Sequence, residues 1–271
     1  MRDELGDLYP QGERDALIRI IALELLNIGS TAFYLKDEIN LDTIQQEKLS
    51  NAIERLKRFE PIQYILGYSD FCGLRFKVTP ATLIPRPETS ELVEWVASEA
   101  TGNESILDIG TGSGCIAISL AHKLPQSKTT AWDISAQAIA TAKENNKLNG
   151  TTVTFVEQDI FAPNNDNVKY DIIVSNPPYI KEIEKVNMQR NVLDWEPSIA
   201  LFVPDSTPLL FYREIAQKGL QLLKDGGKLY FEINREHGKD TYAMLAEYGY
   251  TEIELRKDFA DNDRMIKATK P

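Results

Sequence analysis

Cysteine and histidine are scarce in this chain of 271 residues, which contains two of each. Cys72 and Cys115 give neither a disulfide framework nor the ligand spacing of a zinc site, and so few cysteines fit a reducing cytosol. His122 and His237 lie in different segments, so the sequence offers too few histidines for a histidine-based metal site or a catalytic triad. The composition predicts a protein without a metal centre.

Long apolar runs and an excess of positive charge are also missing. No stretch approaches the roughly 18 uninterrupted apolar residues of a membrane span, and the chain begins Met1-Arg2-Asp3-Glu4 rather than with a signal peptide. Lys and Arg total 30 against 41 Asp and Glu, a formal charge of −11, which argues against binding driven by DNA or RNA phosphates. We therefore expect a cytoplasmic protein that contacts neither membrane nor nucleic acid directly.

Hydrophobic residues make up 42% of the chain, enough for a substantial core, and their spacing changes twice. Apolar residues recur at helical spacing from Gln11 to about Leu66, which predicts a small helical domain over residues 1–67. Short apolar runs broken by Gly73 and Pro80 predict a β-hairpin linker over 68–84. Strands and helices then alternate over 85–271, which is typical of an α/β domain with a parallel sheet.

The third segment contains seven expected strands. They cover residues 105–109, 128–132, 153–157, 170–175, 228–233, 251–257 and 264–268. Helices are expected over residues 88–100, 115–122, 135–149 with Ser135 as the cap, 207–223 with a stop at 224–227, and around 242–248. Residues 180–204 are long and irregular, which in a compact domain usually marks a functional loop.

Asn176-Pro177-Pro178-Tyr179 follows the apolar run 171–175. Two prolines remove two backbone donors and fix φ near about −65°, so the strand stops there and presents one amide side chain and one aromatic ring on a stiff loop. At the carboxyl end of a strand, such a loop can hold a planar NH2 group between the Asn176 oxygen, a backbone carbonyl and the Tyr179 face. An ordinary Pro-Pro turn is the alternative.

A glycine-rich loop lies between the first expected strand of the sheet and the next helix. Its sequence is Asp108-Ile109-Gly110-Thr111-Gly112-Ser113-Gly114, and this pattern lets the backbone turn tightly and approach a ligand. A dinucleotide fingerprint would need its third glycine where Cys115 stands, which weakens an NAD interpretation.

Two acidic residues follow the next two strands. Asp133 is placed to accept both hydroxyls of a ribose, and a helix N-cap is its alternative role. Asp159 is placed to meet an exocyclic amine or the edge of an adenine, with Ile160 packing on the ring, and a plain turn aspartate is the alternative.

The four loops follow strands one to four and converge on one crevice. This arrangement resembles the class I S-adenosylmethionine-dependent methyltransferases, in which the tetrapeptide marks enzymes that methylate a planar nitrogen. The resemblance implies a Rossmann-like seven-stranded sheet and S-adenosyl-L-methionine as the methyl donor. The implied cofactor residues are Asp108, Gly110, Thr111, Gly112, Ser113, Gly114, Asp133, Asp159, Ile160 and Asn176.

Four further stretches narrow the family. Residues 61–67, 83–89, 195–202 and 262–264 are similar to signatures of the glutamine N5-methyltransferases of bacterial peptide chain release factors, known as PrmC or HemK. The family implies methylation of the glutamine in the Gly-Gly-Gln motif of a class I release factor, with the N-terminal helical domain helping to hold that partner. The chain departs from the family at 232–236, where relatives commonly carry glycine, and we expect that departure to affect a loop at the edge of the cofactor. We expect a monomer.

In this interpretation the Asn176 oxygen and the Pro177 carbonyl accept the two amide hydrogens of the substrate. Pro178 keeps the loop stiff, and Tyr179 stacks on the substrate amide or serves packing alone. No metal and no strong base are needed, because the methyl donor carries its own leaving group.

Several other residues have two possible roles. Arg86 and Glu88 either line the pocket edge or form an ion pair at the hinge between domains. Arg264, beside Asp263, meets the substrate or forms a surface ion pair. The long loop offers Trp195 and Phe202, which cover the substrate or pack in a core.

Other functions compete with this one. The same tetrapeptide serves enzymes that methylate amino groups of flipped bases in DNA or RNA, against which the charge argues. A glutamine methyltransferase acting on a ribosomal protein would have an identical catalytic loop. A non-catalytic scaffold predicts a damaged tetrapeptide, and an NAD-dependent oxidoreductase needs pyrophosphate contacts and a hydride site that the sequence does not show.

Overall fold

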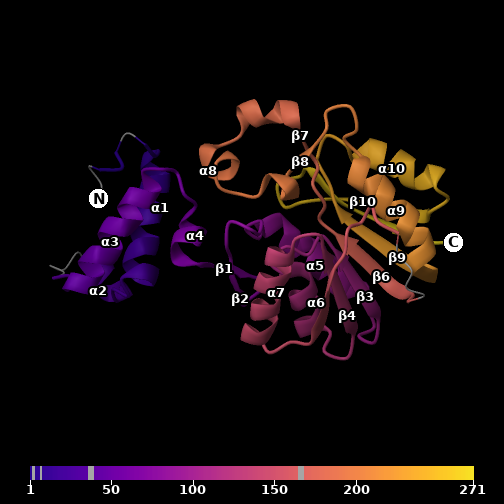
Figure 1. Cartoon of the computed structure of the whole chain (residues 1–271), viewed down its shortest axis with the longest axis horizontal. Coiled ribbons are helices and arrows are strands. Elements are labelled where there is room, and N and C mark those ends of the chain that lie inside the picture. The colour runs from indigo at the N-terminus through magenta and orange to yellow at the C-terminus, as the bar shows by residue number, and fades with distance from the viewer. Residues whose placement is uncertain (2–3, 7, 36–39, 164–167) are drawn as a thin grey trace. The chain divides into compact units, whose positions relative to one another are not determined.

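The computed structural model describes residues 1, 4–6, 8–35, 40–163 and 168–271, and the chain forms two compact units (Figure 1). Unit 1 consists of Met1–Tyr68 and Gln189–Trp195, and unit 2 consists of Ser69–Met188 and Glu196–Pro271. The division into 1–67, 68–84 and 85–271 remains a prediction.

Unit 1 is helical, as expected. Its helices are α1 (Gln11–Ile20), the π-helical turn η1 (Ile21–Leu25), α2 (Ser30–Leu35), α3 (Thr43–Leu56) and α4 (Ile62–Leu66). A capping box starts α3, because Asp42 Oδ1 accepts from the Gln45 backbone at 2.7 Å and Gln45 Oε1 accepts from the Asp42 backbone at 3.1 Å. Gly67 ends α4 with a φ of 82°, in the left-handed region that favours glycine. Leu17, Ile21, Ile53, Leu56 and Ile65 are among the buried residues of its core.

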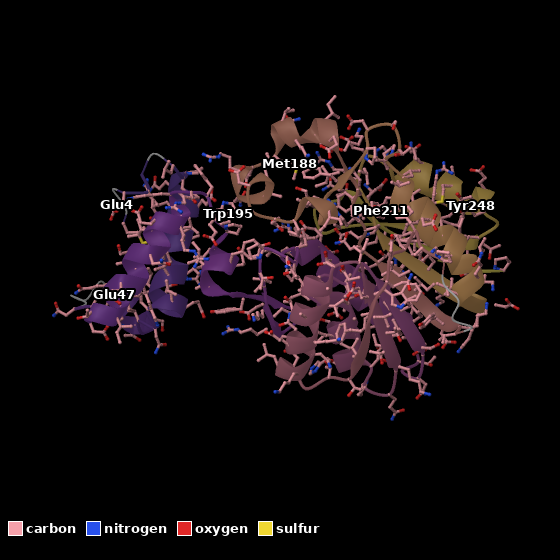
Figure 2. The ribbon with its side chains drawn as sticks, in the orientation of Figure 1. Glu4, Glu47, Met188, Trp195, Phe211 and Tyr248 are labelled. Carbon is pink, nitrogen blue, oxygen red and sulfur yellow. The ribbon has the colours of Figure 1, made fainter. Side chains whose placement is uncertain are left out.

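The middle of the expected loop 180–204 belongs to unit 1. It contains α8 (Arg190–Leu193), whose Arg190 guanidinium lies 4.4 Å from the centre of the Phe59 ring. Trp195, labelled in Figure 2, donates its Nε1 hydrogen to the Arg58 carbonyl at 3.0 Å. Trp195 is half-buried within unit 1, and this hydrogen bond satisfies its indole N–H.

The two ends of the same loop belong to unit 2. They form the parallel strands β7 (Ile180–Lys181) and β8 (Phe202–Val203). Two 3-10 turns, η2 (Glu182–Asn187) and η3 (Ser198–Ala200), complete the loop. Phe202 is half-buried, and the Lys185 ammonium lies 4.2 Å from the centre of its ring.

The expected hairpin is present as β1 (Tyr68–Phe71) and β2 (Leu74–Lys77). The two turn residues, Cys72 and Gly73, have φ of 49° and 77°. Positive φ at both central positions defines a type I′ turn, which matches the twist of a two-stranded ribbon.

Unit 2 is built on a seven-stranded sheet in the order β10-β11-β9-β6-β3-β4-β5, which confirms the predicted fold class (Figure 1). Its strands are β3 (Ser105–Ile109), β4 (Lys128–Asp133), β5 (Val153–Glu157), β6 (Tyr170–Ser175), β9 (Leu223–Glu232), β10 (Thr251–Lys257) and β11 (Asp263–Thr269). β11 runs antiparallel to both of its neighbours, whereas the pairs from β9 across to β5 are parallel. After β3 the chain adds β4 and β5 on one side of that strand and then places β6 on its other side. The strand order therefore reverses between β3 and β6, which creates a topological switch point.

Helices cover both faces of this sheet, because the central strands are apolar on both sides. Ile106 and Ile172 pack with α5 (Pro87–Glu99) and α6 (Cys115–Lys123). Leu107 and Ile173 alternate with them and pack with α9 (Leu210–Leu222) and α10 (Gly238–Glu247) on the other face. Each such side chain stabilises the fold by about 1.5–3 kcal/mol relative to exposure. The remaining helix, α7 (Ala136–Leu148), starts at the predicted cap, where Ser135 Oγ accepts from the Ala138 backbone at 3.2 Å.

Three element boundaries differ from the expectations by three residues or more. The segment 224–227 is not a helix stop but part of β9, where Gly226 has a φ of 74° and the pairing with β6 skips from Leu223 to Lys228, so the glycines form a bulge. α9 begins at Leu210, three residues later than predicted, because residues 207–210 form a turn closed by the Leu210 N–H and the Thr207 carbonyl at 3.1 Å. α10 begins at Gly238, before the predicted start.

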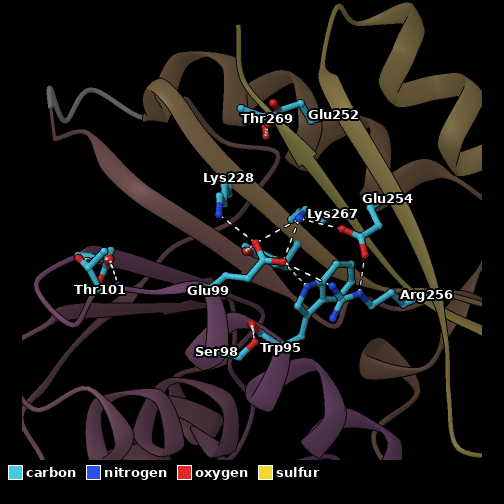
Figure 3. Close-up of polar contacts among 12 residues, drawn as sticks. Trp95, Ser98, Glu99, Thr101, Lys228, Glu252, Glu254, Arg256, Lys267 and Thr269 are labelled. Carbon is cyan, nitrogen blue, oxygen red and sulfur yellow. Dashed lines mark hydrogen bonds and ion pairs between the residues drawn. The ribbon is translucent and has the colours of Figure 1, made fainter.

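A charged cluster ties α5 to the edge of the sheet (Figure 3). Glu99 accepts hydrogen bonds from Lys228 and Lys267, both at 2.9 Å, and from Trp95 Nε1 at 2.6 Å. The Arg256 guanidinium lies 4.0 Å from the centre of the Trp95 ring. Burial raises the pKa of Glu99, but the hydrogen bonds outweigh it and lower that pKa to about 2.

Two negative observations concern the described residues alone. None of their helices combines the length and hydropathy that a membrane crossing requires. No three of their His, Cys, Asp or Glu side chains converge as metal ligands.

Candidate active site

A cavity of about 250 Å³ opens at the carboxyl ends of β3, β4, β5 and β6, at the switch point of the sheet. Eight of the predicted site residues line it: Gly110, Gly112, Asp133, Asp159, Ile160, Asn176, Pro177 and Pro178. A larger hollow of about 660 Å³ lies at the amino-terminal ends of the strands, beside Ser105 and Lys128, and holds none of the predicted residues. The four loops that were expected to converge therefore do meet at one cavity in the folded chain.

The glycine loop needs glycine at positions that a side chain could not occupy without strain. Gly110, Gly112 and Gly114 have φ of 76°, 55° and 82°. A Cβ at Gly112 would meet open space, whereas a Cβ at Gly114 would lie 2.8 Å from Ile118 Cδ1 and 3.1 Å from Ala142 Cβ. The first two glycines thus face the cavity, and the third allows close packing of α6 against α7.

Three predicted loop residues lie behind the loop instead of lining the cavity. Asp108, Thr111 and Ser113 are at most 4% exposed. Thr111 Oγ1 donates to Asp108 Oδ2 at 2.6 Å, and Asn145 Nδ2 donates to the Ser113 carbonyl at 2.9 Å. Burial raises the pKa of Asp108 to about 7. These contacts hold the loop in place from its buried side.

Asp133 lies at the end of β4 and receives one backbone hydrogen bond on each oxygen. Oδ2 accepts from Gly112 at 2.8 Å and Oδ1 from Ser135 at 2.9 Å. The cap of α7 is Ser135, so Asp133 is not that cap. Burial raises the pKa of Asp133, with the backbone N–H groups of Ser135, Gly112 and Ile134 acting against it.

Asp159 and its neighbours form another wall. Asp159 Oδ1 accepts from the Phe161 backbone at 2.8 Å, which is the hydrogen bond expected of a turn aspartate. Asp159 also lines the cavity, so both proposed roles are compatible with its position. Ile134 and Ile160 line the same cavity. The rings of Phe161 and Phe211 pack with centres 5.3 Å apart, and Phe211, labelled in Figure 2, comes from α9. Flat apolar walls of this kind suit a planar ring.

The tetrapeptide presents Asn176 and both prolines to the cavity, whereas Tyr179 does not line it. Asn176 Nδ2 donates to Thr89 Oγ1 at 3.3 Å. The Tyr179 hydroxyl donates to Glu232 Oε1 at 3.2 Å, and its carbonyl accepts from Asn234 Nδ2 at 3.3 Å. Burial and the Glu232 charge raise the pKa of Tyr179.

Two of the residues with two possible roles, Arg86 and Arg264, form ion pairs inside unit 2. Arg86 forms an ion pair with Glu196, which is 5% exposed and also accepts from the Ile84 backbone at 3.1 Å. Arg264 Nε lies 3.0 Å from Asp258 Oδ2, and the Asp258 side chain is 1% exposed. The expectation of a surface pair beside Asp263 is therefore wrong, because the Arg264 partner is buried.

The sequence did not single out several of the residues around this site. Ile134 and Phe161 each directly follow a residue that was predicted, so the strand ends themselves carried the signal. Phe211 had no such signal, because it reaches the cavity from a helix distant in sequence. Glu232, expected in a loop at the cofactor edge, is instead buried against Tyr179.

The sheet order, the glycine loop and the cavity at the switch point are those of a class I methyltransferase. The model of the methyltransferase small domain matches residues 88–194, and that of the PrmC N-terminal domain matches residues 2–67. The crystal structure of a methyltransferase from Pyrococcus furiosus superposes with a TM-score of 0.54 at 18% identity, over 82% of this chain and 98% of that one.

Full-length relatives carry a more specific name. A release factor glutamine methyltransferase of Bacteroides thetaiotaomicron is 49% identical over 100% of this chain and 98% of its own length. One from Flavobacterium psychrophilum is 45% identical over 97% of this chain and 94% of its own length. The chain belongs to the release factor glutamine methyltransferase family.

Proposed function

We propose that this chain transfers a methyl group from S-adenosyl-L-methionine to the side-chain amide nitrogen of the glutamine in the Gly-Gly-Gln motif of a bacterial class I peptide chain release factor. The observation that carries the proposal is 49% identity, along the full chain, with a release factor glutamine methyltransferase. The position of the tetrapeptide at the cavity supports it chemically, because Asn176 brings a carboxamide to the place where the substrate amide would lie.

The cavity fits the methyl donor on three counts. The glycine loop lines the cavity with Gly110 and Gly112 and leads into the N-terminus of α6, whose partial positive charge suits a carboxylate. Asp133 can accept from ribose hydroxyls, and Asp159 can accept from an exocyclic amine. Ile134 and Ile160 offer apolar surface for the adenine ring.

The catalytic role falls to the tetrapeptide. An amide nitrogen is a poor nucleophile because its lone pair is delocalised, so the site must orient it and stabilise the positive charge that develops there. Asn176 Oδ1 and the Pro177 carbonyl accept the two amide hydrogens, and Pro178 restricts the loop. When bound, S-adenosylmethionine supplies a methyl on a sulfonium leaving group; an N–C bond forms, the S–C bond breaks and one amide proton is lost.

The remaining predictions concern the whole chain. Residues 1–67 are the release-factor docking domain, 68–84 the linker and 85–271 the catalytic domain, which the match of 2–67 to the PrmC N-terminal domain supports. Tyr179 either stacks on the substrate amide or serves packing alone, and its position outside the cavity lining favours packing. The protein works in the cytoplasm as a monomer, without direct contact to nucleic acid or membrane and without a metal.

A competition assay tests the proposal. The protein is incubated with labelled S-adenosylmethionine and an equimolar mixture of purified release factor, ribosomal proteins and ribosomal RNA. We expect label in the release factor alone. Label in a ribosomal protein or in RNA would keep the methyl transfer and overturn the partner.

A further inference from the structure

A buried hydrogen-bond network holds the tetrapeptide from the side opposite to the cavity. Thr89, in the first turn of α5, and Glu232, the last residue of β9, are each 2% exposed and stand 143 positions apart in sequence. Thr89 Oγ1 donates to Glu232 Oε2 at 2.6 Å and accepts from Asn176 Nδ2 at 3.3 Å. The other carboxylate oxygen, Oε1, accepts from the Tyr179 hydroxyl at 3.2 Å. One carboxylate therefore connects to both ends of the tetrapeptide.

The direction of these hydrogen bonds fixes the orientation of the Asn176 carboxamide. An ionised carboxylate can only accept, so the single hydrogen of the Thr89 hydroxyl is committed to Glu232. The Thr89 oxygen can then only accept from Asn176, which requires the NH2 group of Asn176 to face it. Asn176 Oδ1 consequently points away from Thr89, and it accepts no hydrogen bond from the described residues.

The charge state of Glu232 is set by opposing influences. Burial raises the pKa of Glu232, with Glu88 acting in the same direction. The hydrogen bonds from Thr89 and Tyr179 and the charge of Arg264 act against it. Burial outweighs them, so the pKa of Glu232 lies above its usual value, and the hydrogen-bond directions given above are those of the carboxylate form.

We propose that Thr89 and Glu232 are positioning residues that turn the acceptor oxygen of Asn176 toward the amide of the substrate. This inference rests on the proposed function, because an acceptor is needed only where the substrate brings N–H groups. If the carboxamide were turned by 180°, its NH2 would face the substrate NH2, and two donors would oppose each other without a hydrogen bond. The same carboxylate holds the Tyr179 hydroxyl and so fixes the orientation of the ring.

Three variants on one helix turn separate the hydroxyl from the packing. Thr89→Val keeps the shape and removes the hydroxyl, whereas Thr89→Ser keeps the hydroxyl and removes a methyl group. Ser90→Ala is the matched control, because the Ser90 hydroxyl donates to the Pro87 carbonyl of its own helix. We expect kcat to fall on the order of 10- to 100-fold in Thr89→Val, with the KM for release factor and the Kd for S-adenosylmethionine within about twofold. Thr89→Ser should stay within about threefold of the unmodified protein, and Ser90→Ala should match it.

Glu232→Gln supplies a second test. A glutamine of the same shape presents one acceptor and one donor group to two hydroxyl donors, so one of the two hydrogen bonds must reverse or break. We expect kcat to fall in the same range with little change in the Kd for S-adenosylmethionine. Normal turnover in both Thr89→Val and Glu232→Gln would overturn the inference. It would also fail if Thr89→Ser were as slow as Thr89→Val, because packing would then explain the loss.

A readout without substrate separates this inference from the proposed function. The side-chain NH2 of Asn176 is assigned in a ¹⁵N-labelled sample from its loss in Asn176→Ala. We expect one of its hydrogens to be protected from exchange in the unmodified protein and in Thr89→Ser, but not in Thr89→Val. Should the protein fail to methylate release factor while this pattern holds, the proposed function is wrong and the network stands. If the protein methylates release factor but the Asn176 hydrogen stays protected in Thr89→Val, the proposed function stands and the hydrogen-bond network is wrong.

Discussion

Asn176 is the residue whose side chain we expect to govern the chemical step rather than binding of the methyl donor. Its Nδ2 donates to Thr89 at 3.3 Å, and its Oδ1 accepts no hydrogen bond from the residues that the structure describes, so it can accept from the substrate. In Asn176→Ala, kcat should fall on the order of 100-fold, as for loss of one preorganised polar contact, while the Kd for S-adenosylmethionine stays within about threefold. Single-turnover kinetics and calorimetry measure the two quantities. Asn103→Ala, at an exposed position between α5 and β3, is the control, and a normal rate in Asn176→Ala would remove Asn176 from the mechanism.

Two glycines of one loop should respond differently to alanine. Gly114→Ala combines a φ of 82° with a new Cβ that lies 3.1 Å from Ala142 Cβ of α7 and 2.8 Å from Ile118 Cδ1, so the free energy of unfolding should fall by about 2–4 kcal/mol. Gly112→Ala, with a φ of 55° and no atom within 4 Å of the new Cβ, should lose about 1–2 kcal/mol but bind S-adenosylmethionine more weakly. Urea unfolding and calorimetry test the pair. Equal stability of the two variants would contradict the close packing of α6 on α7.

At the scale of elements, the Glu99 cluster links α5 to the sheet and should contribute to stability in a pH-dependent way. The pKa of Glu99 is lowered to about 2 in the folded protein, below its ordinary value of 4.5. A lowered pKa in the folded state means that the contribution is present above about pH 4.5 and is lost as the pH falls toward 2. Glu99→Gln should therefore be less stable than the unmodified protein at neutral pH, and the difference should shrink in this acid window.

Thermal unfolding between neutral pH and the lowest pH at which the protein remains folded measures this difference. Glu91→Gln, on the same helix, is the matched control, because glutamine keeps an oxygen that can accept from the Phe259 backbone N–H at the position of Glu91 Oε1. A Glu99→Gln difference that is constant with pH would assign the loss to geometry instead of charge.

Sequence patterns predicted the strands of unit 2 well, because these strands are short apolar runs that end in polar turns. The bounds of β3, β5, β6 and β10 are as expected. The start of β9 was missed, because Gly226-Gly227 is a typical stop signal and a bulge is decided by pairing with β6, which local sequence does not encode.

The same distinction applies to the site. Asp133, Asp159 and Asn176 could be predicted because each lies at or just beyond the carboxyl end of a parallel strand, and such ends meet at one edge of the sheet. The contact between Thr89 and Glu232 could not, because it joins a helix start to a strand end 143 residues away. The buried positions of Asp108 and Thr111 also depend on packing that a loop pattern does not specify.

At the scale of the whole molecule, the chain combines a helical unit that has its own core with a catalytic unit. The segment Gln189–Trp195 is inserted between β7 and β8 but belongs to the helical unit. A formal charge of −11 suits a protein partner with basic surface better than it suits RNA. We therefore expect this protein to recognise a folded protein partner and to methylate one glutamine on it.

The position of the new methyl group tests that central claim most directly. Release factor methylated by this protein is digested and fragmented by tandem mass spectrometry, beside a release factor whose Gly-Gly-Gln glutamine is replaced by glutamate. We expect one methyl on the side-chain amide of that glutamine and none on the variant. A methyl at any other residue, or equal labelling of the variant, would contradict it.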